Sequence, residues 1–133
     1  MDEKVRYKIY GSADYRSLTD AQKSVFRNVA AELDERQLLK ATDSVVIASY
    51  CRNATIARAA SKEIEKNGIV LRQDDKYRGE IVKENPAVSI LLRAQKSMED
   101  TAIRLGLTPT GRKRLRDEEK PKSASDAWDE IDD

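Results

Sequence analysis

Residues 85–109, NPAVSILLRAQKSMEDTAIRLGLTP, decide the fold of this chain of 133 residues. Asn85 is a favourable helix N-cap, and Pro86 follows at the first helical position, where its missing N–H costs nothing. Apolar and small side chains then recur at helical spacing until Gly106, a natural helix end: Leu91, Ala94, Met98, Ala102 and Leu105. The stretch predicts a helix with a coiled-coil-like seam. Four of its residues are expected to form an oligomer interface: Leu91, Met98, Ala102 and Leu105.

Two further helices are expected upstream of this stretch. The first begins at Thr19, which has capping-box spacing with Gln22, and we expect it to end near residues 36–39. The second opens at residues 42–43 and stops at Gly68. Its basic side chains are expected to form a solvated face rather than a DNA site: Arg52, Arg58, Lys62 and Lys66.

The remaining predicted elements are small. Two β-branched runs, residues 69–71 and 80–82, flank a polar stretch and predict a hairpin or a structured loop. Thr108 and Pro109 begin a short fourth helix. The expected fold class is therefore mainly α, with three main helices, a small hairpin or loop, and a short fourth helix.

Residues 1–17 show no sustained period and are expected to be a flexible N-terminal arm. Basic residues alternate there with tyrosines, a pattern that can follow a nucleic-acid backbone or pack on a neighbouring subunit. Residues 18–116 form the expected helical oligomerisation and DNA-recognition domain. Residues 117–133 are rich in Glu, Lys, Pro, Ser and Asp, so we expect a disordered acidic tail.

Composition favours an oligomer and disfavours an enzyme. Hydrophobic residues are 39% and charged residues 37% of the chain, so the core is small and is more easily completed by a neighbouring subunit. There is no histidine, the commonest general base and metal ligand. The single cysteine, Cys51, cannot form a disulfide framework or a zinc finger and is expected to be a buried, inert thiol. No apolar run approaches the roughly 20 residues of a membrane span, so we expect a soluble, intracellular protein.

Two motifs resemble catalytic sites, but neither one predicts an enzyme. Gly106 and Gly111 have the separation found in a phosphate-binding loop, but Arg112 and Lys113 follow where that loop needs Lys and then Ser or Thr. The acidic pair at residues 74–75 sits in a predicted turn, which accounts for it without a metal. We therefore expect no catalytic residues, no metal site and no cofactor.

The net charge of +1 conceals a basic stretch near the end of the chain. It consists of Arg112, Lys113, Arg114 and Arg116. On a helix, positions 112 and 116 share a face while 113 and 114 point elsewhere, so the charge suits backbone phosphates better than base edges. We expect these four residues to bind DNA. Pairing with the acids at residues 117–119 or with a neighbouring subunit remains an alternative.

The chain ends with an acidic segment, residues 126–133, that contains its only tryptophan. Trp128 and Ile131 lie three residues apart, with Asp129 and Glu130 between them. One helical turn of this composition could bind a basic, apolar groove on a partner. The open alternatives are a tryptophan folded back on its own ring, or a tail that screens the basic stretch.

The order of these features resembles the P27-like family of tailed-phage terminase small subunits. The resemblance is carried by the Asn-Pro helix start and by Leu105-Gly106-Leu107-Thr108-Pro109, followed by Arg112, Arg114 and Leu115. Weaker upstream matches extend it over roughly residues 25–115: residues 31–39, Asp43, Tyr50-Cys51 and residues 64–68. The chain departs from the family at Thr110-Gly111, where members carry small hydroxyl residues. A glycine there weakens the helix by roughly 1 kcal/mol relative to Ala, so fraying or kinking is expected.

The resemblance implies a non-catalytic viral DNA-packaging protein in the host cell cytoplasm. Such small subunits form homo-oligomeric rings, recognise viral double-stranded DNA, and recruit and regulate a large terminase subunit that holds the ATPase and nuclease. Two other interpretations remain. One is a helical DNA-binding transcription regulator or adaptor without a packaging role, and the other is a purely structural helical assembly protein.

Overall fold

The computed structural model describes residues 1–119 as a mainly helical protein. The elements are α1 (Glu3–Tyr10), α2 (Ala13–Arg16), α3 (Asp20–Glu35), the 3₁₀ helix η1 (Ala41–Asp43), α4 (Ser44–Asn67), β1 (Val70–Asp75), β2 (Gly79–Glu84), α5 (Pro86–Leu105) and α6 (Pro109–Glu119). The three main helices, the hairpin and the short fourth helix expected from the sequence are confirmed. Residues 117–119 of the expected tail belong to α6, and its remainder lies outside the described residues.

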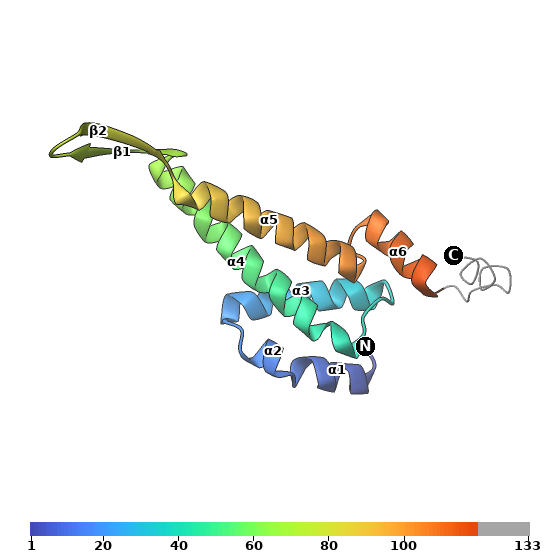
Figure 1. Ribbon diagram of the computed structural model, residues 1–133. Helices are drawn as coiled ribbons and strands as arrows, with labels where there is room; N and C mark the ends of the chain where they lie inside the picture. Colours follow the sequence, from blue (N-terminus) through green and yellow to red (C-terminus); the bar gives the residue numbers. More distant parts are fainter. Residues whose placement is uncertain (120–133) are drawn as a thin grey trace, which may run out of the picture.

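The molecule has a head and an arm (Figure 1). The arm consists of α4 and α5, which run antiparallel and side by side, with the β1–β2 hairpin at its far tip. The head consists of α1, α2, α3 and α6, gathered around the start of α4 and the end of α5. The chain travels out along α4 and back along α5, so its N-terminal and C-terminal parts meet in the head.

Side-chain caps fix the ends of the main helices. Thr19 Oγ1 accepts a hydrogen bond from the Gln22 amide at 3.3 Å, and Gln22 Oε1 accepts one from the Thr19 amide at 3.0 Å, so the predicted capping box is present. Asn85 Oδ1 accepts from the Ala87 amide at 3.0 Å, and its Nδ2 donates to the Gly68 carbonyl at 2.8 Å. Asn85 thus starts α5 and ties it to the end of α4.

The two strands form an antiparallel hairpin that is largely exposed. Its register runs from Val70 opposite Glu84 to Asp75 opposite Gly79. Asp75 Oδ1 accepts from the Tyr77 amide at 2.8 Å, which gives this carboxylate the turn-forming role expected from the sequence.

The N-terminal residues differ from the flexible arm expected for residues 1–17. They form α1 and α2, capped by Asp2 and Ser12. Ile9 is fully buried, and the rings of Tyr10 and Tyr15 lie 6.0 and 5.0 Å from the ring of Phe26. Helices of eight and four residues are too short to show a helical period in the sequence, and tertiary packing stabilises them instead.

The hydrophobic core lies in the head. It is built around Phe26, Leu33 and Ile47, all fully buried, with further residues from α1, the connection before α3, α3 itself, the start of α4 and the end of α5: Ile9, Leu18, Val29, Ala30, Ala48, Cys51 and Leu105. The arm buries smaller side chains, among them Ala60, Ala87 and Ala94. Within residues 1–119, no helix combines the length and the apolar composition that crossing a bilayer requires.

Candidate nucleic-acid interface

A tight connection fixes α6, which carries the basic stretch, against the end of α5. Gly106 adopts the left-handed conformation at the end of α5, with a φ of 79°, and the Leu107 amide donates to the Ala102 carbonyl at 2.9 Å. Thr108 Oγ1 then accepts from the Gly111 amide at 3.0 Å, which caps α6 as predicted. The helix therefore begins only a few residues after the preceding one ends.

Gly111 has a packing role that the sequence did not reveal. It is buried, and a Cβ placed on it would lie 2.2 Å from the Ile103 carbonyl oxygen of α5. Only a residue without a side chain allows this approach of the two helices. The expected fraying or kinking is wrong for the described residues, because α6 runs without a break from Pro109 to Glu119.

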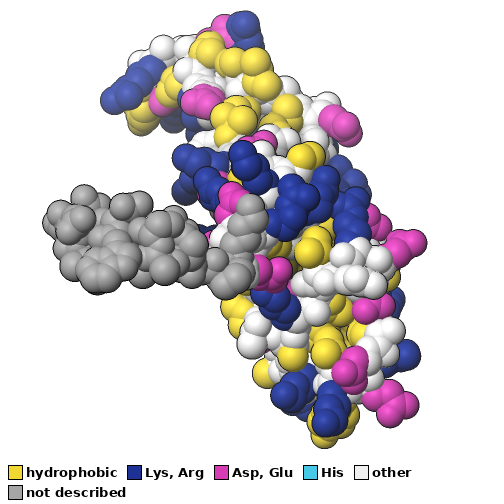
Figure 2. All heavy atoms as spheres, turned by 90° about the vertical axis from the view of Figure 1, so that its right-hand side faces the viewer, with side chains coloured by type: hydrophobic (Ala, Val, Ile, Leu, Met, Phe, Trp, Pro, Cys, Tyr) yellow, Lys and Arg dark blue, Asp and Glu magenta, His cyan; other side chains and the backbone are white. Residues whose placement is uncertain are grey.

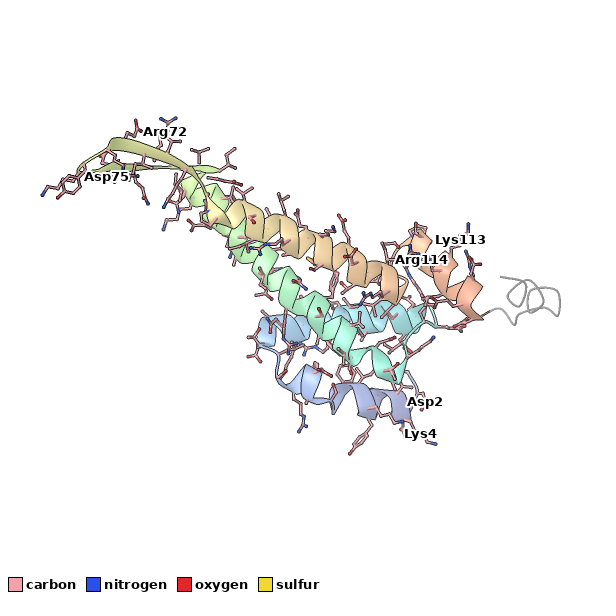
Figure 3. All side chains as sticks on the ribbon, viewed as in Figure 1. Asp2, Lys4, Arg72, Asp75, Lys113 and Arg114 are labelled. Atoms are coloured by element: carbon pink, nitrogen blue, oxygen red, sulfur yellow. The ribbon has the colours of Figure 1, made fainter. Side chains whose placement is uncertain are left out.

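The four residues of the basic stretch lie on different sides of α6. Arg112 is half-buried, and its Nη1 donates to the carbonyls of Leu107 at 3.3 Å and Gly106 at 3.5 Å, so it also braces the connection. Lys113, Arg114 and Arg116 are exposed. Figure 3 shows Lys113 and Arg114 on the side of α6 opposite to α1 and α2.

None of the four basic side chains forms an ion pair with an acidic side chain among residues 1–119. The single ion pair of α6 there joins Glu119 to Lys40 at 3.7 Å, and none involves the basic stretch. The alternative pairing with residues 117–119 is therefore absent in the described part of the chain. Lys and Arg side chains gather across the middle of the face seen from the α6 end of the head (Figure 2).

Two further arginines border α6 and were not singled out in the sequence. Arg104 lines a groove with Arg114 on one side of the helix, and Arg36 lines a pocket with Arg116 on the other. Arg104 could have been noticed as a basic residue in the last turn of α5. Arg36 could not, because nothing in the sequence indicates that the end of α3 faces α6.

The basic residues of α4 agree with a solvated face. Arg52, Arg58, Lys62 and Lys66 are all exposed. Arg52 Nη2 donates to Ser17 Oγ at 2.9 Å, which links the start of the arm to the head.

The predicted oligomer residues lie along the side of α5 that packs on α4. Leu105 is buried in the core of the head, whereas Leu91, Met98 and Ala102 are half-buried. Met98 and Ala102 line an open groove of about 400 Å³ between the two helices, together with Tyr50, Gln95 and Glu99. The predicted partner residues Trp128, Asp129, Glu130 and Ile131 lie outside the described residues.

No cluster suited to metal chemistry occurs in the described part of the chain. No group of three or more Cys, Asp or Glu side chains among residues 1–119 could hold a metal ion. Cys51 is fully buried, as expected, and burial raises the pKa of its thiol to about 11.

We expect Cys51 to resist alkylation in the folded protein. A pKa of about 11 instead of the ordinary 9.0 reduces the reactive thiolate at neutral pH about 100-fold, and burial excludes the reagent as well. Labelling with iodoacetamide, followed by mass spectrometry, should be slow in native protein and fast in urea. Because the folded pKa lies above the unfolded one, the contribution of this buried thiol to stability is full below about pH 9.0 and is lost as the pH rises towards 11. Fast labelling of native protein would contradict the assignment.

The fold and the site define a mainly helical protein. Within residues 1–119, its surface offers charged and apolar side chains for binding other molecules. The family described as "Phage terminase, small subunit" matches residues 22–122, and the chain belongs to that family. Membership confirms the resemblance found in the sequence and supports a role in phage DNA packaging. Proteins of this kind are generally non-catalytic. No curated protein and no solved structure matches the chain.

Proposed function

We propose that this protein is a non-catalytic packaging subunit that recognises viral double-stranded DNA and recruits and regulates the large terminase subunit, the ATPase and nuclease of the motor. The family match over residues 22–122 is the observation that carries the proposal. Such a protein would act in the host cell cytoplasm, where viral DNA and the motor meet. It needs no cofactor, since its task is to bind rather than to react.

The DNA-binding surface in this proposal is the basic stretch. Lys113, Arg114 and Arg116 are exposed cations without an acidic partner among residues 1–119, so phosphates can neutralise them and release counterions. Arg112 belongs to the set, but its guanidinium also holds two carbonyls at the end of α5. Cations that point around a helix favour backbone contacts over base reading, which predicts binding with strong salt dependence and little sequence preference from α6 itself.

Assembly into a homo-oligomeric ring is the second part of the proposal. Large apolar side chains are exposed along the arm, including Leu92 at 60%, Ile56 at 46% and Ile90 at 39%. Apolar surface of this kind is normally covered by another protein surface. The proposed interface uses the α5 seam, where Leu91, Met98 and Ala102 are partly accessible, and Leu105 holds the end of the helix in the head.

Native mass spectrometry tests the assembly directly. We expect a closed ring of several subunits, because a head-to-tail contact between identical chains closes into a ring when the rotation allows it. A monomer or a dimer would contradict the ring. A dimer would favour a transcription regulator, although residues 36–43 separate α3 from α4 where a helix-turn-helix protein has a three- or four-residue turn.

The motor-binding element in this proposal is the acidic segment, through Trp128, Asp129, Glu130 and Ile131. We expect deletion of residues 128–133 to abolish association with the large subunit in a pull-down, because the deletion removes both the apolar anchors and most of the carboxylates. The oligomer mass should not change, since the proposed interface lies on α5. Replacing Lys122 and Ser123 with Ala serves as a control outside the segment. Intact association after the deletion would refute this role.

A further inference from the structure

A pocket of about 520 Å³ lies between the end of α3 and α6. It is lined by Arg36, Leu38, Arg112, Leu115, Arg116 and Glu119. Positions 112, 115, 116 and 119 share one face of α6, because residues three and four apart are neighbours on a helix. The groove lined by Arg104 and Arg114 lies on another side and shares only Leu115 with the pocket. The volume is in the range of pockets that bind small ligands or single large side chains.

The pocket combines an apolar floor with a cationic rim. Leu38 and Leu115 converge on Gly106: a Cβ placed on that glycine would lie 3.2 Å from Leu38 Cδ1 and 2.8 Å from Leu115 Cδ1. The rim carries three arginines and one acid, Glu119, whose carboxylate pairs with Lys40 at 3.7 Å. Arg36 pairs with Glu32 at 2.6 Å, and Arg112 donates to two carbonyls. Arg116 is therefore the rim arginine without a partner among residues 1–119. Such a site suits a large apolar side chain flanked by carboxylates, and arginines also favour the face of a tryptophan ring.

We propose that the occupant of this pocket is the acidic segment of the same chain, with Trp128 on the leucine floor and its carboxylates against the arginine rim. Residues 126–133 carry five acidic side chains, no basic one, and the only tryptophan of the protein. The segment is therefore opposite in charge to the arginines of the rim. Its tryptophan supplies a large apolar side chain that can cover the leucine floor.

The position of Glu119 makes this docking sterically feasible. Glu119 lines the pocket, and Trp128 follows it by nine residues. Nine residues span at most about 30 Å when fully extended, which is ample for a return to a pocket at the start of the tether. A tether this short gives the segment an effective concentration in the millimolar range, so even weak contacts hold it in place.

Docking would place the acidic segment in competition with DNA. Arg116 belongs both to the pocket rim and to the basic stretch, so one carboxylate or one phosphate can occupy it at a time. This consequence rests on the proposed function, whereas the docking itself does not. The segment would then lower DNA affinity until the motor withdraws it.

Fluorescence of Trp128 tests the docking in the full chain without DNA, because this residue is the only tryptophan. Excitation that tyrosine does not absorb, with acrylamide as collisional quencher, reports how accessible the ring is. We expect less quenching in the protein than in a synthetic peptide of residues 120–133. Replacing Arg36 and Arg116 with Ala should increase the undocked fraction about fivefold or more, since each lost pair weakens docking. The matched control, Arg104→Ala with Arg114→Ala, removes the same charge from the other groove and should leave quenching unchanged.

Four results would count against the proposal or its consequence. Wild-type quenching equal to that of the peptide overturns the docking. If quenching of Trp128 rises equally in both double variants, the acidic segment does not dock in the α3–α6 pocket. Added salt gives a test without any substitution: quenching of the wild-type chain should rise as the charges are screened, and a flat response counts against the arginine rim. Unchanged DNA affinity after truncation behind Ser125 overturns only the competition with DNA.

Discussion

Replacing Lys113, Arg114 and Arg116 together with Ala is expected to remove most of the salt-dependent DNA affinity of this protein. Each phosphate contact contributes about 0.9 to the slope of log affinity against log salt, so three lost contacts reduce the slope by about 2.7 for each subunit that touches DNA. When the salt concentration rises fourfold, the factor by which the variant loses DNA affinity should be roughly 40-fold smaller than the factor for the wild type. Titration of a fluorescent duplex at several salt concentrations measures both quantities. Arg112 is left in place because it also holds the carbonyls of Gly106 and Leu107.

A matched variant on the arm separates this effect from a general loss of charge. Arg58, Lys62 and Lys66 lie one turn apart on α4 and are exposed, so their replacement with Ala removes the same three charges from a different surface. We expect that variant to keep a slope close to the wild-type value. An unchanged slope in the α6 variant, or an equal reduction in both variants, would show that α6 is not the DNA-binding surface.

The sequence was sufficient for the elements with strong local signals. The Thr19 capping box, the Asn85–Pro86 start and Gly106 at the end of α5 each act within a few residues, and the structure has helix boundaries at all three. The buried state of Cys51 was also predictable, because a lone cysteine inside a long helix is more often a buried, inert thiol than a reactive one. Signals of this kind need no knowledge of what the helix packs against.

What the sequence could not provide depends on contacts between distant segments. The helices at residues 3–16 are stabilised by packing of Tyr10 and Tyr15 on Phe26, which no local pattern encodes. The pocket between α3 and α6 joins Arg36 and Leu38 to residues more than seventy positions later, so it becomes visible only in the fold. The basic stretch itself was evident from composition, but the bracing role of Arg112 was not.

For replacement of Gly111 with Ala, local helix propensity and tertiary packing predict effects of opposite sign on stability. Local propensity predicts that Gly111→Ala stabilises α6 by roughly 1 kcal/mol. The structure predicts the reverse, because the new Cβ would lie 2.2 Å from the Ile103 carbonyl oxygen, a backbone atom that cannot rotate away. Overpacking of this kind costs typically 1–3 kcal/mol and sometimes more, so we expect a net loss of about 2 kcal/mol and a fall in Tm of roughly 10 °C.

The same exchange at a neighbouring exposed position provides the control. Lys113 lies two residues further along α6 with its side chain in solvent, so Lys113→Ala should be more stable than Lys113→Gly by about 1 kcal/mol. Thermal melts followed by circular dichroism give the global effect, and hydrogen exchange of the α6 amides detects a helix that separates from α5 without unfolding of the head. If alanine stabilises both positions, α6 does not pack against Ile103 in solution. If it stabilises position 113 and destabilises position 111, the close approach of α5 and α6 holds the basic stretch in place, and the DNA affinity of Gly111→Ala should fall with the stability of α6.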